Sequence, residues 1–310
     1  MSNGLSRPEP TRNEKRRAAR EKAQSARLEQ KKKERRNRLL IQGGVAVGVV
    51  AIAAATVIGI VSAIPKTSPG PLNMLSDGIR IGAGAQAEIT PALQPGASPV
   101  ASELTEDPDV VDIVMYVDYL CSGCGEFEDA NAEQIETWVS SGAATLEVHP
   151  VAFLDRLSLG SQYSTRAANA AACVANYSPN NFLEFHGLLF DKQPEEGTTG
   201  LDDEELVDLA ERAGVTTISS VEQCIDEVRF KKWVNAATAR AFEGPLPNAD
   251  IDAVTRTPTV IVNGFAYPAE DLGDASDFAK FVSTASGNAF SDTLKATPSP
   301  SPSPSAAPAS

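Results

Sequence analysis

The sequence predicts an α/β domain preceded by one N-terminal transmembrane helix. Two observations support this fold class. An apolar strand pattern runs directly into a helical pattern and then into a second strand pattern, which is the order of a βαβ unit. Nearer the N-terminus, residues 39–64 form a run of 26 residues without a charged side chain. Because the 310-residue chain exceeds the usual ~100–200 residues of one domain, we expect further segments outside the α/β domain.

The first 38 residues are strongly basic. They contain 14 Lys and Arg against five acidic residues, a net charge of +9, whereas the rest of the chain carries −23. An acidic body excludes broad nucleic-acid binding by the folded part, because such binding depends on cations that neutralise phosphates. Basic segments beside a membrane span stay on the cytoplasmic side. We therefore expect residues 1–38 to be a cytoplasmic tail.

Residues 39–64 are long enough to cross a bilayer, which requires ~20 apolar residues. A cleaved signal peptide is the alternative, since Val61, Ser62 and Ala63 resemble a cleavage site. A signal peptide, however, has an apolar region of only ~7–15 residues behind a short basic start. The sequence therefore favours a single-pass anchor in the cell membrane, with the chain after Lys66 outside the cytoplasm.

Two segments that flank the expected domain have linker-like compositions. Residues 65–108 are rich in Pro, Gly and Ala and are interpreted as a tether, although residues 77–81 could form a short strand. Residues 291–310 are rich in Pro, Ser and Ala and cannot bury a core, so we expect a disordered tail. This leaves residues 109–290 as the folded domain.

The domain begins with an apolar run at residues 110–117, which predicts a buried strand. A helix that ends at Gly142 and a strand at residues 144–148 are expected to follow. The two strands should be parallel, with a right-handed crossover. Residues 258–267 predict a hairpin with its turn at Asn-Gly, followed by a helix through Phe281.

Residues 150–257 form a long insertion between the second strand and the hairpin. Its apolar spacing is helical, and Thr199 and Asp202 have the spacing of a capping box, with Gly214 at the expected helix end. Helices are expected at residues 161–177, 182–190, 202–213 and 218–242.

Cys121 and Cys124 lie where the first strand becomes a helix. Free backbone N–H groups and the helix dipole at that end favour a thiolate, so Cys121 is the expected nucleophile. Cys124, one turn later, is the expected resolving thiol. Zinc sites use the same spacing, and the two histidines of the chain, His149 and His186, could complete such a site. No second Cys pair with ligand spacing follows, so we expect neither a metal nor a cofactor.

The stretches DYLCSGCGEFE at residues 118–128 and TPTVIVNG at residues 257–264 resemble the thioredoxin fold. They are most similar to DsbA-like thiol-disulfide oxidoreductases in their membrane-anchored bacterial form. The resemblance covers about residues 110–285, including the helical insertion. It implies a cis peptide bond before Pro258, next to the dithiol, where the backbone of Thr257 pairs with bound peptide. A trans bond at a strand start is the alternative reading.

The chain departs from the family pattern at two places. Ser122 and Gly123 stand between the cysteines, where the strongly oxidising member of the family has a histidine, so the redox potential is open. Thioredoxin-like proteins often have a buried carboxylate six residues before the first cysteine, and here this residue is Met115. Asp118 is nearer and is equally well explained as a solvated or a loop-capping residue.

Cys173 and Cys224 lie on two helical segments of the insertion. If Cys121 pairs with Cys124, these two are the remaining partners for a structural disulfide. Two free buried thiols are the alternative. We expect the disulfide, because disulfides persist outside the cytoplasm.

Together these features predict a membrane-tethered, extracytoplasmic thiol-disulfide oxidoreductase that forms or exchanges disulfides in exported proteins. The alternatives are a disulfide reductase or isomerase, and a non-catalytic thioredoxin-fold binding module. The expected partners are thiols and disulfides of exported proteins and a membrane redox partner, which is quinone-linked if the protein is an oxidant. The sequence does not fix the direction of exchange.

Overall fold

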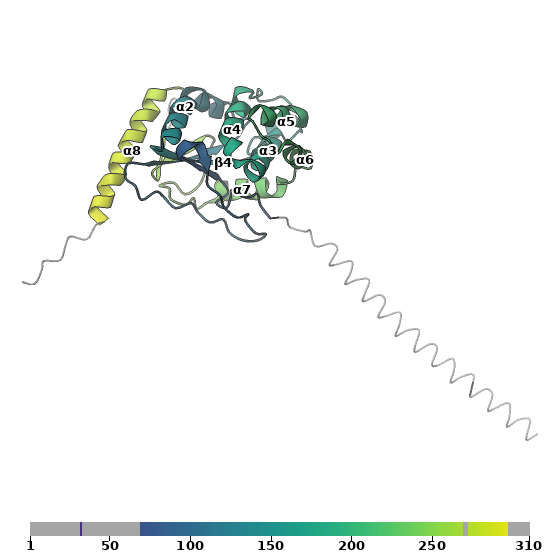
Figure 1. Cartoon of the computed structure of the whole chain (residues 1–310), viewed down its shortest axis with the longest axis horizontal. Coiled ribbons are helices and arrows are strands. Elements are labelled where there is room, and N and C mark those ends of the chain that lie inside the picture. The colour runs from purple at the N-terminus through teal and green to yellow at the C-terminus, as the bar shows by residue number, and fades with distance from the viewer. Residues whose placement is uncertain (1–31, 33–68, 269–271, 297–310) are drawn as a thin grey trace, which may run out of the picture. The chain divides into compact units, whose positions relative to one another are not determined.

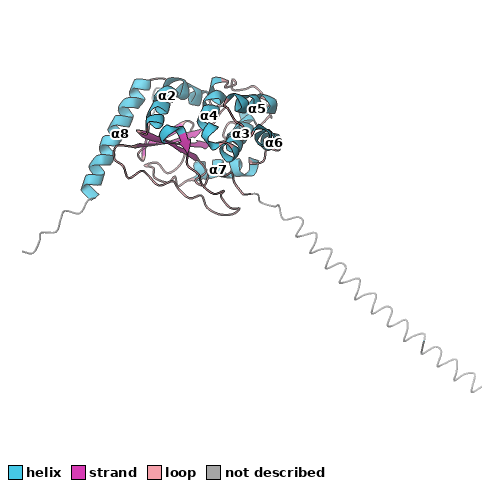
Figure 2. Cartoon of the chain, viewed as in Figure 1, coloured by secondary structure: helices cyan, strands magenta, loops and turns pink. Residues whose placement is uncertain are grey.

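The structure, a computed structural model, describes residues 69–268 and 272–296 together with Lys32. In this part of the chain, helices cover mainly one face of a six-stranded mixed sheet (Figure 2). The strand order is β2-β1-β4-β3-β5-β6. The strands are β1 (Ile79–Gly82), β2 (Gln86–Ala87), β3 (Val111–Val117), β4 (Ala144–Pro150), β5 (Thr259–Val262) and β6 (Phe265–Ala266).

The predicted βαβ unit forms the centre of the sheet. β3 and β4 pair in parallel, with Val111 opposite Ala144. α2 (Ser122–Ser141) connects them and ends at Gly142, whose φ of 81° provides the left-handed cap. The parallel arrangement and the helix end are therefore confirmed.

The predicted hairpin is also confirmed. β5 pairs antiparallel with β3, and β6 returns antiparallel to β5. Asn263 and Gly264 between them have φ of 47° and 87°. A two-residue hairpin turn needs positive φ at both positions, which Asn and Gly tolerate best.

The insertion between β4 and β5 is helical, as predicted, and its helices α3 to α6 gather on the side of α2 opposite to α8 (Figure 1). The insertion helices are α3 (Tyr163–Tyr177), α4 (Phe182–Asp191), α5 (Asp203–Arg212), α6 (Ile218–Asp226) and α7 (Lys231–Glu243). α8 (Ala275–Ala296) follows the hairpin. Single 3-10 turns occur at Ala83–Ala85, Asp155–Leu157 and Pro179–Asn181.

Two details of the insertion differ from the prediction. Asp202, not Thr199, is the N-cap of α5, and it forms a capping box with Glu205. The expected helix over residues 218–242 is broken between α6 and α7, where Val228 has φ of 42°. The apolar spacing continues through this break, because both helices bury a face in the same core, and for that reason the pattern did not reveal it.

The segment interpreted as a tether is part of the fold from residue 69 onward. Ile79 and Ile81 of β1 are buried, and β1 pairs antiparallel with β4. Met74 is buried as well, and Asn73 donates a hydrogen bond of 2.8 Å to the Ala175 carbonyl of α3. Residues 69–108 therefore do not form a free tether, because Met74, Ile79, Ile81 and Leu93 fill core positions despite the high Pro and Gly content.

The two faces of the sheet have separate cores. Met115 and Val117 of β3 pack on the side of α2 and the insertion helices. Tyr116, between them, points to the opposite side and packs with Ala241 of α7 and with Leu246. This alternation follows from the two-residue period of a strand.

α8 extends beyond the predicted domain end at residue 290 and reaches Ala296. No proline interrupts the sequence before Pro298, so the helix can continue into the segment interpreted as a tail. Residues 297–310, the basic segment 1–38 apart from Lys32, and the predicted span 39–64 lie outside the described residues. Among the helices that are described, none combines the length and the apolar character of a membrane span.

Candidate active site

The two cysteines of the Cys-x-x-Cys motif lie at the N-terminal end of α2, directly after β3. Cys121 is the N-cap residue, and Cys124 lies inside the first turn, where its N–H donates to the Cys121 carbonyl at 2.9 Å. Both are free thiols, so the structure has the reduced dithiol. Cys121 retains 7% of its surface and Cys124 none, so only Cys121 is open to attack from outside.

The two thiols differ in acidity. A hydrogen bond with the Cys124 side chain, supported by the Thr257 side chain and the Cys124 backbone N–H, lowers the pKa of Cys121 to about 7 although burial opposes it. Burial raises the pKa of Cys124 well above its usual value, and the hydrogen bond with Cys121 adds to this. At neutral pH the Cys121 sulfur is therefore the one that ionises, which suits it as the attacking atom.

The peptide bond between Thr257 and Pro258 is cis. The Cys121 thiol donates to the Thr257 carbonyl at 3.2 Å, so the loop before β5 lies against the dithiol. A Cβ on Gly123 would come within 3.6 Å of Pro258 Cδ and 3.2 Å of Leu272 Cδ1, which shows how closely this loop and the segment before α8 cover the motif. The structure thus brings together the four residues that the sequence assigned to the site: Cys121, Cys124, Thr257 and Pro258.

The insertion contributes two further residues that the sequence did not indicate. Gln193, after α4, donates to the Cys121 carbonyl at 2.8 Å. Glu196 accepts hydrogen bonds from the backbone N–H and the hydroxyl of Ser122, at 3.0 and 2.9 Å. Both lie about 70 residues from the motif in a loop without a recognisable pattern, so no signal in the sequence links them to it.

Asp118 is fully buried three residues before Cys121, and it is not a solvated residue. Its carboxylate accepts from the N–H groups of Leu120 (2.9 Å), Phe153 (2.8 Å) and Leu154 (2.8 Å), so it caps two loops at the end of the sheet. Burial raises its pKa although these donors oppose the change. The position six residues before Cys121 is Met115, which is also buried.

The two histidines have partners elsewhere. His186 of α4 is buried between Tyr119 and Glu128, with 3.0 Å to each. His149 of β4 contacts Glu147 at 3.2 Å and stacks on Tyr116. Within the described residues, no group of three or more His, Cys, Asp or Glu side chains is arranged to hold a metal ion.

Cys173 of α3 and Cys224 of α6 form a disulfide with an S–S distance of 2.02 Å. Both side chains are fully buried. The bond joins two helices of the insertion that are 51 residues apart in sequence, at a place separate from the Cys-x-x-Cys motif.

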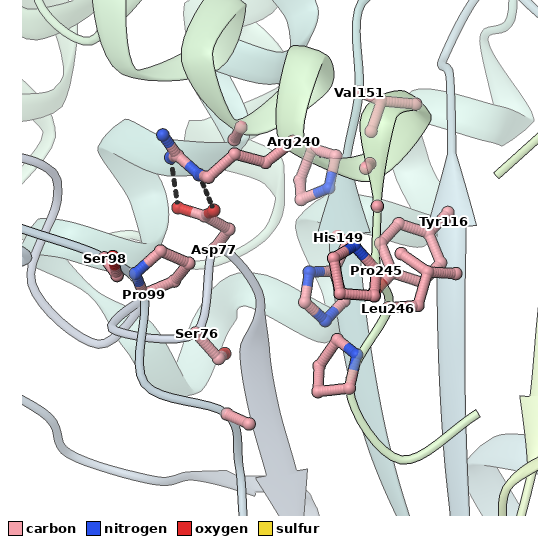
Figure 3. Close-up of a pocket in the computed structure, with 16 residues that line it drawn as sticks. Ser76, Asp77, Ser98, Pro99, Tyr116, His149, Val151, Arg240, Pro245 and Leu246 are labelled. Carbon is pink, nitrogen blue, oxygen red and sulfur yellow. Dashed lines mark hydrogen bonds and ion pairs between the residues drawn. The ribbon is translucent and has the colours of Figure 1, made fainter. Parts of the chain in front are cut away.

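A pocket of about 240 Å³ lies on the other face of the sheet (Figure 3). On one side of it, Arg240 binds both carboxylate oxygens of Asp77, at 2.6 and 2.8 Å. His149, Tyr116 and Leu246 form the other side (Figure 3). The pocket contains no cysteine and its guanidinium is already paired, so the candidate redox site is the dithiol and not this pocket.

Comparison with known proteins agrees with this geometry. A family model described as thioredoxin matches residues 108–299. The reduced form of the disulfide bond oxidoreductase DsbG from Mycobacterium tuberculosis matches with a TM-score of 0.50 and 29% identity, over 72% of this chain and 95% of that chain. Oxidised BdbD from Bacillus subtilis has a TM-score of 0.50 at 19% identity, over 71% of this chain and 97% of that chain. At this identity the match supports the fold alone.

One match is to part of a larger protein. The serine/threonine-protein kinase PknE from Mycobacterium tuberculosis is 34% identical over 125 residues, which cover 38% of this chain. The chain spans only 22% of the length of that kinase, so the match relates one region of the two proteins and not the kinase as a whole.

Proposed function

The chain belongs to the thioredoxin family, and from this premise we propose that it is a DsbA-like thiol-disulfide oxidoreductase acting on exported proteins. One observation carries the proposal. An accessible Cys121 with a pKa of about 7 lies at a helix N-terminus beside a buried Cys124 whose pKa is far higher. This is the division between an attacking and a resolving sulfur that thiol-disulfide exchange requires.

In the oxidising direction the protein starts with a disulfide between Cys121 and Cys124. A client thiolate attacks the Cys121 sulfur, the bond between the two cysteines breaks, and Cys124 leaves as a thiolate that takes up a proton. A second client thiolate then attacks the client sulfur of the mixed disulfide and releases Cys121 as a thiolate. The client loses two electrons and the dithiol gains them.

In the reducing direction the Cys121 thiolate attacks a client disulfide and releases one client thiolate. Cys124 then attacks the Cys121 sulfur and releases the second. The direction depends on the reduction potential of the pair relative to its partners. A potential measured against glutathione for the full-length chain therefore decides between oxidase and reductase.

Insulin reduction and the oxidation of a dithiol peptide test the activity itself. We expect turnover in at least one assay and none after Cys121→Ala. A chain that is folded but inactive in both assays would instead be the binding module that keeps its cysteines without using them for exchange.

We further propose that a single-pass anchor at residues 39–64 holds the domain outside the cytoplasm. The support is the sequence, with a charge of +9 before a run of 26 uncharged residues. Protease added to intact cells should cut the acidic domain and spare residues 1–38. A protected domain with a cut basic segment would reverse the orientation.

A membrane-tethered exchange protein needs a redox partner that returns Cys121 and Cys124 to their starting state, the disulfide in an oxidase or the dithiol in a reductase. An oxidase would transfer two electrons to a quinone-linked membrane protein, and a reductase would receive two electrons from a membrane electron carrier. Crosslinking through Cys121 in membranes, compared with the measured potential, distinguishes these two partners.

A further inference from the structure

The Glu196 carboxylate lies at the N-terminal end of α2. One of its oxygens, Oε1, accepts both the N–H of Ser122, at 3.0 Å, and the Ser122 hydroxyl, at 2.9 Å. Ser122 is the first residue of α2 and directly follows Cys121. A carboxylate thus accepts the hydrogen bond of a helix N-terminal N–H group next to Cys121, whose sulfur is the proposed nucleophile.

The loop that carries Glu196 is fixed on both sides of this residue. Before it, the Gln193 amide donates to the carbonyls of Cys121 (2.8 Å) and Tyr119 (3.3 Å). After it, the Gly197 N–H donates to the Leu157 carbonyl at 2.8 Å. Although Glu196 is exposed to solvent, its carboxylate is therefore held at the helix end by its own contacts and by the backbone on either side.

A negative charge at this place opposes the thiolate. The helix terminus favours an anion at Cys121, but a like charge bound to the next residue, Ser122, disfavours it. The first turn of α2 contains no acidic residue of its own, and its last turn contains no basic residue. Glu196, from the insertion, therefore adds an acidic group to this helix end. On the inner side, the buried Asp118 carboxylate opposes the thiolate in the same sense.

We propose that Glu196 is a positioning residue that disfavours the Cys121 thiolate and so makes the Cys121–Cys124 disulfide a weaker oxidant than the helix terminus alone would make it. The inference rests on the proposed function. It adds that a residue of the insertion, Glu196, tunes the reduction potential of the dithiol. Reduction of the disulfide consumes two electrons. It takes up two protons below the pKa of Cys121, and one proton above that pKa, where Cys121 is formed as a thiolate. Disfavouring the thiolate therefore disfavours the reduced form.

The test uses the full-length chain with Glu196→Gln, which keeps an oxygen acceptor for Ser122 and removes only the charge. Glu195→Gln is the matched control, because Glu195 is an exposed neighbour in the same loop. The first measurement is the pH titration of thiolate absorbance in the ultraviolet, which needs no redox activity. The second is the equilibrium constant with glutathione at about pH 5.5 and about pH 8.5.

For Glu196→Gln we expect the acid dissociation constant of Cys121 to rise about threefold, as for a nearby but solvent-screened charge. The equilibrium constant should move about threefold toward the reduced dithiol at pH 8.5, which is about 15 mV at 29.6 mV per tenfold change. At pH 5.5, where Cys121 is protonated in both proteins, the equilibrium constant should be almost unchanged. Glu195→Gln should leave all values as in the wild type.

An unchanged titration in Glu196→Gln would overturn the inference, and so would an equal shift in Glu195→Gln. A redox shift of the same size at both pH values would also overturn it, since a structural change does not follow the ionisation of Cys121. If glutathione exchange fails in every protein while the titration shifts as expected, the effect of Glu196 on the thiolate stands and the proposed function fails.

Discussion

The two cysteine pairs of this chain share one chemistry and differ in almost everything that surrounds them. Cys121 and Cys124 are free, three residues apart, and lie at a helix end. Cys173 and Cys224 are bonded, 51 residues apart and fully buried between α3 and α6. The first pair lies beside the Thr257 carbonyl in the first turn of α2, where Cys121 keeps a small part of its surface, whereas the second pair is fully buried between two insertion helices.

This difference shows that position and not residue type decides what a cysteine does. At the end of α2 the dipole and the hydrogen bonds favour a thiolate, and the sulfur can be reached. In the middle of α3 there is no free N–H group and no access, so a bond formed there stays formed. The following experiments ask how far this separation of a reactive and a structural pair holds.

The largest effect is expected within the reactive pair. Cys124→Ala should accumulate mixed disulfides between Cys121 and client proteins, while Cys121→Ala should trap almost none. At pH 7 about half of Cys121 is ionised, against a few per cent for an ordinary thiol, and the raised pKa of Cys124 leaves it less ionised still. Alkylation of Cys124 should therefore be more than about tenfold slower than alkylation of Cys121. Both variants are compared in one strain with one thiol-blocking protocol. Equal trapping would mean that the two sulfurs do not divide the roles.

The structural pair should affect stability and not chemistry. Replacing Cys173 and Cys224 together by Ala should lower the free energy of unfolding by about 4 kcal/mol, the chain-entropy value for a loop of this length. Urea unfolding followed by circular dichroism measures this. The thiolate titration of Cys121 serves as control and should stay at about pH 7. Recovery of both residues as alkylatable thiols from unreduced protein would show that no such bond exists.

The pH dependence should separate the pairs further. Because the pKa of Cys121 is lowered from 9.0 to about 7, its thiolate stabilises the reduced fold above pH 9 and this contribution is lost as pH falls through 7. The stability difference between the reduced wild type and Cys121→Ala should therefore shrink from pH 9 toward pH 6. Chemical unfolding of the two proteins across this range measures it, and the Cys173–Cys224 bond, which does not titrate, is intact in both. A constant difference would contradict the lowered pKa.

The smallest effect is expected at the loop before β5. Pro258→Ala should keep the fold and change the lifetime of the mixed disulfide severalfold, because the Thr257 carbonyl lies 3.2 Å from the Cys121 sulfur. Quenched-flow measurement of mixed disulfide decay with a cysteine peptide tests this, with Cys173 and Cys224 alkylation as a check on the fold. An unchanged lifetime would remove this loop from the site.

The sequence predicted those features that depend on neighbouring residues. The strand, the dithiol and the helix are contiguous from residue 110 to Gly142, and the Asn263-Gly264 turn needs only two residues. The approach of Thr257 to Cys121, across 136 residues, came instead from the family resemblance. The catalytic roles of Cys121, Cys124 and Thr257 remain predictions, which the experiments above test.

The remaining features depend on contacts that leave no local pattern. Glu196 and Gln193 reach the dithiol only because the insertion folds back over α2. The interpretation of residues 65–108 as a tether failed because composition counts many small residues, while packing is decided by few large ones such as Met74 and Ile79. The capping box was expected at Thr199 and Asp202, but it forms three residues later, with Asp202 as the N-cap and Glu205 as its partner.

The sheet ends in very short strands on both sides, since β2 and β6 contain two residues each. An exposed edge offers unpaired backbone N–H and C=O groups to any extended chain nearby, and a long edge is a template for strand addition. An oxidoreductase of unfolded exported proteins, as proposed above, would meet extended chains continuously. With so little edge available on either side, such a client would be held through a sulfur and a few contacts at one loop, and then released, without adding a strand to the sheet.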